Sequence, residues 1–272
     1  MEPIISVDVL AQMWDQEEVI ILDASPTSNK SGLVAAHPGK KIKGARIFNL
    51  KKVFSDLESA YPNMLPQPKL FEEAAQALGI NNESMVVVYD NLGIYTAPRV
   101  RWMFRVMGFN QIAVLDGGLS AWIDSGHPVE AMEAPNTYYK GNFEAQYKLN
   151  LIKSMVQVED STKHQAFMIL DARSKGRFEG TAPEPRADLP SGSIPGSLNL
   201  PFTSVLNNGK MKTKEELRSI FGALPIKDYP LVFSCGSGLT ACIVLLAGEL
   251  VLENEMAVYD GSWTEWAMCK LV

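Results

Sequence analysis

The sequence predicts an α/β protein made of two tandem copies of one unit, each a mostly parallel central sheet covered by helices on both faces. The chain length, an internal repeat and the alternation of apolar runs with amphipathic segments all point to this fold. At 272 residues the chain is about twice the usual domain size. Its hydrophobic residues make up 46% of the total, which is enough apolar material for two cores.

The internal repeat consists of four motifs that occur twice in the same order. The pairs are VIILDAS with FMILDARS, KGARIFNL with PGSLNLPF, MVVVYD with PLVFSC, and LDGGLSAW with YDGSWTEW. The two members of each pair lie about 145–150 residues apart, a nearly constant offset that indicates duplication of one structural unit. We therefore expect a first domain over residues 1–130, a linker over 131–150 and a second domain over 151–272.

Short apolar runs bounded by turn residues predict buried parallel strands. These runs cover 20–23, 85–90 and 112–116 in the first unit and 168–170, 231–235 and 256–260 in the second. Amphipathic segments between the runs predict helices over 68–79, 97–108, 213–224 and 239–251. A helix after a strand is typical of βα units, so we expect a parallel sheet in each half.

Composition and charge exclude several classes of protein. The net charge of −6 argues against nucleic-acid binding, which needs a basic surface. No stretch approaches the ~18 apolar residues of a membrane span, and the N-terminus lacks the basic and apolar regions of a secretory signal. Cys235, Cys242 and Cys269 are odd in number and lack CxxC spacing. This pattern argues against a disulfide framework or a zinc site, and we expect reduced thiols in a cytoplasmic protein. We also expect no metal and no cofactor.

The segment 231–246 carries the strongest chemical signal, because Cys235 directly follows a predicted buried strand and precedes a predicted helix. The loop after it consists of Gly236, Ser237, Gly238, Leu239 and Thr240. Its small residues let the backbone curl so that successive N–H groups form an anion-binding nest at the helix N-terminus. This field favours the thiolate of Cys235, at the edge where open α/β sheets place their sites. Thr240 has an alternative role as a helix cap.

A buried structural cysteine is the commoner case for an arbitrary cysteine. The glycine loop and the strand-to-helix position reverse that preference for Cys235. For Cys242 the structural interpretation stays favoured, and we expect Cys269, near the C-terminus, to be inert.

The motifs CGSGLTA and YDGSWTEW, together with LDARSKGRFEGTAPEPR and SGSIPGSLNLPF, resemble those of the 3-mercaptopyruvate sulfurtransferases, relatives of thiosulfate sulfurtransferase (rhodanese). The resemblance covers essentially the whole chain. It implies two rhodanese-like domains, of which the first is catalytically inactive and the second carries the cysteine. The sequence agrees, because Asp90 occupies the strand end that corresponds to Cys235.

The resemblance also implies an activity and its partners. Cys235 takes sulfur from 3-mercaptopyruvate, releases pyruvate, and passes the sulfur from a persulfide to a thiol or cyanide acceptor. The loop N–H groups stabilise the persulfide as an oxyanion hole stabilises oxygen. The expected partners are small molecules, with neither nucleic acid nor membrane, and the expected state is a monomer or weak dimer.

Further residues receive roles from the same resemblance. Arg177 and Arg186 match arginines that bind the donor carboxylate, for which a planar guanidinium is suited. Tyr95 matches a tyrosine that faces the active site, and Ser237 is a hydrogen-bond partner or proton relay for the nucleophile. Lys41 aligns with a family histidine that works with the serine, although a lysine is a poorer acid–base group at neutral pH. Two alternatives stay open: the two arginines could be ordinary surface residues of a loop, and Tyr95 could serve only in packing.

Alternative activities differ in what they require around the cysteine. A cysteine-dependent phosphatase of this fold needs an arginine six residues after the nucleophile, where this chain has Ala241. Thiosulfate-type relatives place cationic residues directly after the cysteine, whereas Gly236 and Ser237 are neutral, which favours mercaptopyruvate. A thiosulfate sulfurtransferase and a non-enzymatic sulfur-binding module remain the alternatives.

Overall fold

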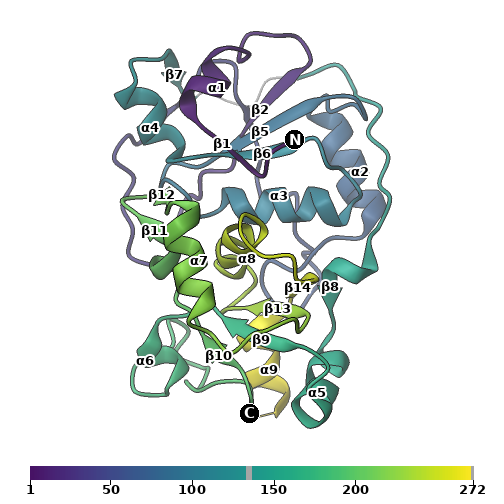
Figure 1. Cartoon of the computed structure of the whole chain (residues 1–272). Helices are drawn as coiled ribbons and strands as arrows, with labels where there is room; N and C mark the ends of the chain where they lie inside the picture. Colours follow the sequence, from purple (N-terminus) through teal and green to yellow (C-terminus); the bar gives the residue numbers. More distant parts are fainter. Residues whose placement is uncertain (133–136, 271–272) are drawn as a thin grey trace. The chain divides into compact units, whose positions relative to one another are not determined.

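In the computed structural model, which describes residues 1–132 and 137–270, the chain forms two compact units (Figure 1). Unit 1 comprises Met1–Leu57, Leu65–Lys148 and Asn208–Met211, and unit 2 comprises Glu58–Met64, Leu149–Asn207 and Lys212–Val272. Two short segments thus belong to the unit formed by the other repeat. Residues 58–64 fold with the second unit, and residues 208–211 fold with the first.

Unit 1 is built on a five-stranded sheet whose recorded strand pairs are all parallel. Its strand order is β1 (Ile4–Ile5), β6 (Ile112–Leu115), β5 (Met85–Tyr89), β2 (Val19–Asp23) and β4 (Arg46–Ile47). The accompanying helices are α1 (Val7–Ala11), α2 (Pro68–Ala77), α3 (Ala97–Val106) and α4 (Gly118–Asp124). A separate antiparallel pair joins β3 (Lys40–Ile42) to β7 (Val129–Ala131).

Unit 2 repeats this plan with another five-stranded parallel sheet. Its strand order is β8 (Ile152–Lys153), β14 (Met256–Tyr259), β13 (Leu231–Ser234), β9 (Met168–Asp171) and β10 (Leu198–Asn199). Its helices are α5 (Met155–His164), α6 (Lys175–Phe178), α7 (Lys214–Gly222), α8 (Ala241–Glu249) and α9 (Ser262–Lys270), with 3₁₀ turns at Leu149–Leu151 and Phe202–Val205. Two further short strands are β11 (Leu206–Asn207) and, in the segment that folds with unit 1, β12 (Lys210–Met211).

The two sheets share one strand order, in which the first strand of each unit is an edge and β5 or β13 is the centre. The predicted fold class is confirmed, since helices cover both faces of each sheet (Figure 1). Helix α3 ends at Val106, two residues before the predicted end, because Gly108 has a left-handed backbone (φ 84°) that stops the helix. Helix α8 begins at Ala241 rather than 239, because Gly238 (φ 77°) turns the chain first.

The unit 2 core fixes the two elements that flank the cysteine. Val232 of β13, Tyr259 of β14 and Trp263 of α9 belong to one buried cluster. Helix α8 is buried over eight consecutive residues from Ala241, in agreement with its apolar sequence. The end of β13 therefore lies between two anchored helices, α8 and α9.

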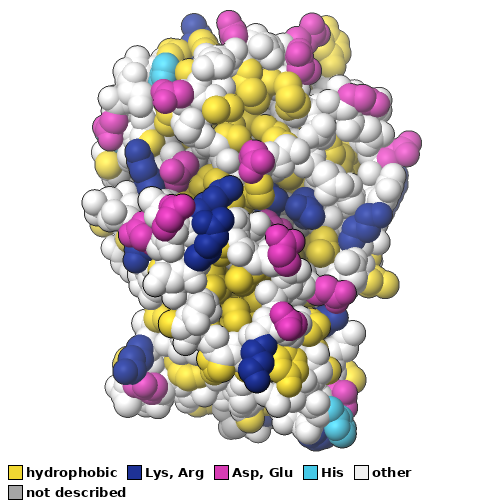
Figure 2. Space-filling view, in the orientation of Figure 1, with side chains coloured by type: hydrophobic (Ala, Val, Ile, Leu, Met, Phe, Trp, Pro, Cys, Tyr) yellow, Lys and Arg dark blue, Asp and Glu magenta, His cyan; other side chains and the backbone are white. Residues whose placement is uncertain are grey.

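The surface shows no segregation of charge on the face in Figure 2, where basic side chains are interspersed with acidic ones. None of the helices in the described part of the chain is long and apolar enough to cross a membrane.

Candidate active site

Cys235 lies directly after the central strand β13, and it is 2% exposed. The first turn of α9 holds the backbone at this point. The carbonyl oxygen of Cys235 accepts the N–H of Trp263 at 2.9 Å, and that of Gly236 accepts the N–H of Thr264 at 3.0 Å. The C=O and N–H of a trans peptide point in opposite directions, so the N–H groups of Gly236 and Ser237 point away from α9.

The rest of the loop adds a row of backbone donors. Among the described residues, the N–H groups of Leu239, Thr240 and Ala241 have no hydrogen-bond acceptor. Thr240 occupies the N-cap position of α8, but its side chain makes no capping hydrogen bond, so the capping role is not seen. The loop thus presents N–H groups at the N-terminus of a buried helix, where the helix dipole also favours an anion.

In the corresponding loop of unit 1, the backbone N–H groups donate to a carboxylate. Asp90 directly follows β5, as Cys235 follows β13. Its Oδ1 accepts the N–H of Leu92 at 3.0 Å, and its Oδ2 accepts the N–H groups of Tyr95, Thr96 and Ala97 at 2.9, 2.7 and 2.9 Å. The Asp90 carbonyl accepts the N–H of Leu119, just as the Cys235 carbonyl accepts that of Trp263. In the first repeat, therefore, the nest is filled by a carboxylate.

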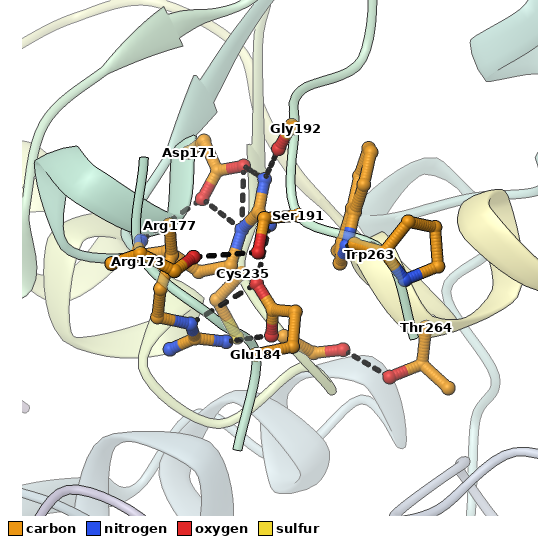
Figure 3. Close-up of polar contacts among 12 residues, drawn as sticks. Asp171, Arg173, Arg177, Glu184, Ser191, Gly192, Cys235, Trp263 and Thr264 are labelled. Carbon is orange, nitrogen blue, oxygen red and sulfur yellow. Dashed lines mark hydrogen bonds and ion pairs between the residues drawn. The ribbon is translucent and has the colours of Figure 1, made fainter. Parts of the chain in front are cut away.

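A buried arginine organises the polar residues beside Cys235 (Figure 3). Arg173 donates from Nε and Nη2 to the carboxylate of Asp171, and from Nη1 to Glu184 at 2.8 Å. Nη2 also reaches the carbonyl of Gly192 at 2.7 Å, and the guanidinium lies 4.4 Å from the ring centroid of Trp263. Burial alone would lower the pKa of Arg173, but the two carboxylates outweigh it and raise that pKa. The sequence prediction missed Arg173 and Glu184, although both lie in the segment that carries the family resemblance.

Arg177 lies on the one-turn helix α6, and it contacts both Glu184 and the cysteine loop. Its Nε and Nη2 donate to the two carboxylate oxygens of Glu184 at 3.1 and 2.5 Å. A Cβ atom built on Gly236 would lie 2.9 Å from Nη2 of Arg177, closer than real Cβ contacts allow without a shift. Glycine at position 236 therefore lets the arginine lie against the loop.

Arg186 reaches the same part of the loop through a threonine. Its Nη1 donates to Oγ1 of Thr264 at 2.6 Å, and that hydroxyl donates to the carbonyl of Gly236 at 2.6 Å. Burial lowers the pKa of Arg186, while the negative charges of Asp188, Glu184 and Cys235 oppose this. Arg177 and Arg186 thus converge on Gly236, and Thr264 is a third residue that the sequence prediction missed.

Ser237 has a partner from a distant part of the sequence. The side-chain amide of Asn63 donates to Oγ of Ser237 at 3.0 Å and to its carbonyl at 3.2 Å. Asn63 belongs to the segment 58–64, which folds with unit 2, and its backbone is left-handed (φ 61°). Nothing in the local sequence pattern predicts this contact, because 174 residues separate the two positions.

A family model described as rhodanese-like domain matches residues 6–125 and 154–269. The chain belongs to the rhodanese-like family. It is 39% identical over 254 residues to the mouse (Mus musculus) 3-mercaptopyruvate sulfurtransferase, covering 91% of this chain and 84% of that protein. It is 41% identical over 232 residues to the Cricetulus griseus thiosulfate sulfurtransferase, covering 84% and 77%.

Among solved structures, the chain is similar to SseA from Escherichia coli, described as a 3-mercaptopyruvate sulfotransferase with the rhodanese fold. The TM-score is 0.84 at 33% identity, and the match covers 97% of this chain and 99% of that one. These findings confirm the prediction that the protein is a sulfurtransferase of this family. Relatives named for either donor are about equally identical, so the donor has to be argued from the site.

Two further residues predicted for this rhodanese-like site lie in unit 1. Lys41 donates from Nζ to the carbonyl of Ala45 at 2.8 Å and forms an ion pair with Glu130. These contacts give Lys41 a structural role within its own unit. Tyr95 is buried, and its backbone N–H is one of the donors to Asp90. Substrate binding by Lys41 and Tyr95 stays a prediction.

The other two cysteines differ from Cys235 in their surroundings. Cys242 is fully buried in the first turn of α8, where its thiol donates to the carbonyl of Gly238 at 3.3 Å. Cys269 is exposed, with its sulfur 3.3 Å from the hydroxyl of Tyr61. Within residues 1–132 and 137–270, no group of three or more His, Cys, Asp or Glu residues could hold a metal ion.

Proposed function

We propose that this sulfurtransferase moves sulfur from 3-mercaptopyruvate to a thiophilic acceptor through a persulfide on Cys235. The observation that carries the proposal is the nest around Asp90, because the loop after Cys235 occupies the corresponding place in the second repeat. A carboxylate oxygen of aspartate is two bonds from Cβ, and the outer sulfur of a cysteine persulfide is also two bonds from Cβ. The position that Oδ2 of Asp90 occupies in unit 1 corresponds to the outer sulfur in unit 2.

The donors to that sulfur follow from aligning the two helix starts. Ala97 begins α3 seven residues after Asp90, and Ala241 begins α8 six residues after Cys235, so the unit 2 loop is one residue shorter. Counted back from the helix starts, the donors Tyr95, Thr96 and Ala97 correspond to Leu239, Thr240 and Ala241. These N–H groups have no acceptor within the described residues, whereas their unit 1 counterparts are occupied. The loop of residues 236–240, with Ala241, is therefore suited to stabilise a persulfide anion at the helix N-terminus.

The transfer then runs in two steps. In the first, the Cys235 thiolate attacks the donor sulfur, an S–S bond forms, and the C–S bond breaks with its electron pair moving to the carbon. The resulting enolate takes the proton from the transferred sulfur, directly or through solvent, to give pyruvate and an ionised persulfide. In the second, a thiolate or cyanide attacks the outer sulfur, and the S–S electron pair returns to Cys235.

The choice of donor rests on the charges around the loop. Mercaptopyruvate carries one carboxylate, and Arg177 and Arg186 both lie beside Gly236 with planar guanidinium groups suited to it. Gly236 and Ser237 provide no cationic side chain of the kind that would suit the thiosulfate dianion. Thiosulfate remains the second candidate, since relatives of that name are as similar as the mercaptopyruvate enzymes.

Ser237 fits a supporting role. Because Asn63 donates to its Oγ, the hydroxyl proton of Ser237 is directed elsewhere and can be donated to the sulfur of Cys235 or of the donor. The cysteine pattern and the net charge of −6 further lead us to propose a cytoplasmic location with no nucleic acid among the partners. The family resemblance leads us to propose a monomer or weak dimer.

The proposal is tested by measuring pyruvate release and cyanide-dependent thiocyanate formation with each donor. We expect a higher kcat/KM for mercaptopyruvate, and loss of all turnover in Cys235→Ser. A folded wild-type protein that transfers sulfur from neither donor would instead support a non-enzymatic module. A higher kcat/KM for thiosulfate would assign the second candidate.

A further inference from the structure

We infer that Glu184 determines donor specificity, by holding Arg177 in place and by leaving the site one net positive charge for a donor with one carboxylate. The inference rests on the proposed function, since it concerns the same Cys235 site. It assigns the discrimination between donors to Glu184, a carboxylate that acts on the cysteine loop through its contact with Arg177.

Glu184 is a buried carboxylate shared between two arginines. Its side chain is 3% exposed, and it accepts from Nη1 of Arg173 at 2.8 Å and from Nε and Nη2 of Arg177 at 3.1 and 2.5 Å. Arg173 has a second carboxylate of its own, Asp171, which takes three of its donor contacts. The carboxylate of Glu184 is therefore the one that holds Arg177 (Figure 3).

The contact fixes the direction in which Arg177 faces. The Nε edge of the guanidinium is engaged by Glu184, while Nη2 lies against Gly236. A two-point contact between a carboxylate and a guanidinium fixes the plane of both groups. The remaining N–H donors of Arg177 are thus presented in one orientation beside the cysteine loop, ready for a planar carboxylate.

The same contact sets the charge that a donor meets. Arg173, Arg177 and Arg186 carry three positive charges, against two negative charges on Asp171 and Glu184. Asp188 also acts on Arg186, but it is exposed, so water and salt screen its charge. The loop N–H groups and the helix N-terminus stabilise the Cys235 thiolate. Apart from that thiolate, the cluster therefore retains one net positive charge, which matches mercaptopyruvate better than the thiosulfate dianion.

Two substitutions separate orientation from charge. Glu184→Gln keeps the shape, weakens the hold on Arg177 and leaves two net positive charges, whereas Glu184→Asp keeps the charge and shortens the side chain. Arg173 retains Asp171 and the carbonyl of Gly192 in both variants, so unit 2 keeps most of this network. Glu179→Gln is the matched control. It removes the same negative charge, but from a carboxylate whose ion pair with Lys175, at 3.7 Å, is exposed to solvent.

The readout is kcat/KM for each donor, with circular dichroism and thermal unfolding to verify folding. For Glu184→Gln we expect KM to rise for mercaptopyruvate and fall for thiosulfate, so that the ratio of the two kcat/KM values drops about tenfold. For Glu184→Asp we expect KM to rise for mercaptopyruvate with no gain for thiosulfate, and for Glu179→Gln an unchanged ratio.

Equal changes in kcat/KM for both donors in a folded Glu184→Gln variant would overturn the inference and leave the proposed function intact. A shift of the ratio in Glu179→Gln as large as in Glu184→Gln would also overturn it, because net charge alone would then explain the effect. If wild type transfers sulfur from neither donor, it is the proposed function that fails.

Discussion

Thr264→Val tests the link between Arg186 and the cysteine loop, because valine keeps the shape of threonine and removes the hydroxyl. That hydroxyl accepts from Nη1 of Arg186 and donates to the carbonyl of Gly236, both at 2.6 Å. A hydrogen bond to a charged group contributes about 1.5–3 kcal/mol and a neutral one about 0.5–1.5 kcal/mol. Arg186 is half-buried and water can replace part of its contact, so we take the lower end of each of these two energy ranges.

The expected loss in the free energy of unfolding of unit 2 is therefore about 2 kcal/mol. The carbonyl of Gly236 keeps the N–H of Thr264 at 3.0 Å, so the loop remains anchored to α9. The freed guanidinium of Arg186 samples more orientations, and we expect KM for mercaptopyruvate to rise about five- to tenfold, since 1.4 kcal/mol corresponds to tenfold. Initial rates of pyruvate release and urea denaturation followed by circular dichroism measure the two effects.

Thr264→Ser is the control, since serine keeps both hydrogen bonds and should stay close to wild type in KM. The reasoning is refuted if Thr264→Val binds mercaptopyruvate as tightly as Thr264→Ser. It is also refuted if valine lowers stability without any change in KM, because the hydroxyl would then serve packing of the loop alone.

Substitutions at three other residues test individual contacts around the site. Arg186→Ala should raise KM for mercaptopyruvate more than for thiosulfate in steady-state assays, and equal losses for both donors would remove Arg186 from carboxylate binding. Cys242→Ser should retain most activity, because a hydroxyl still donates to the carbonyl of Gly238; a folded but inactive variant would show that this thiol takes part in the reaction. Asn63→Asp replaces a donor that faces two oxygens of Ser237 with an acceptor, and we expect kcat/KM to fall about tenfold. Asn63→Gly, which keeps the left-handed backbone, should lose less, and the opposite order would contradict donation by Asn63.

The features that the sequence predicted are local or repeated ones. The duplicated motifs and the strand-to-helix position of Cys235 depend on residues close in sequence, so the fold class and the loop after β13 could be predicted. Arg177 and Arg186 could be named because family motifs surround them, and the structure brings both to Gly236. The predicted helix ends were too long where glycines with left-handed backbones stop or delay the helix.

Two of the residues that the sequence prediction missed, Thr264 and Asn63, make contacts across longer separations. Thr264 meets the Gly236 carbonyl across 28 residues, and Asn63 meets Ser237 across 174. Such contacts depend on tertiary packing, here on α9 lying at the end of β13 and on the segment 58–64 folding with unit 2. The motif alignment placed Lys41 at the position of the family histidine that works with the serine. The described partners of Lys41 are Ala45 and Glu130. A side chain that does contact Ser237 is that of Asn63.

Mass spectrometry of the protein after brief incubation with mercaptopyruvate, without an acceptor, tests the account most directly. We predict that the peptide containing Cys235 gains the mass of one sulfur atom, that cyanide removes the gain, and that peptides containing Cys242 or Cys269 are unchanged. Sulfur on Cys242 or Cys269 instead, or pyruvate release with no sulfur added to Cys235, would contradict a persulfide held by the loop amides.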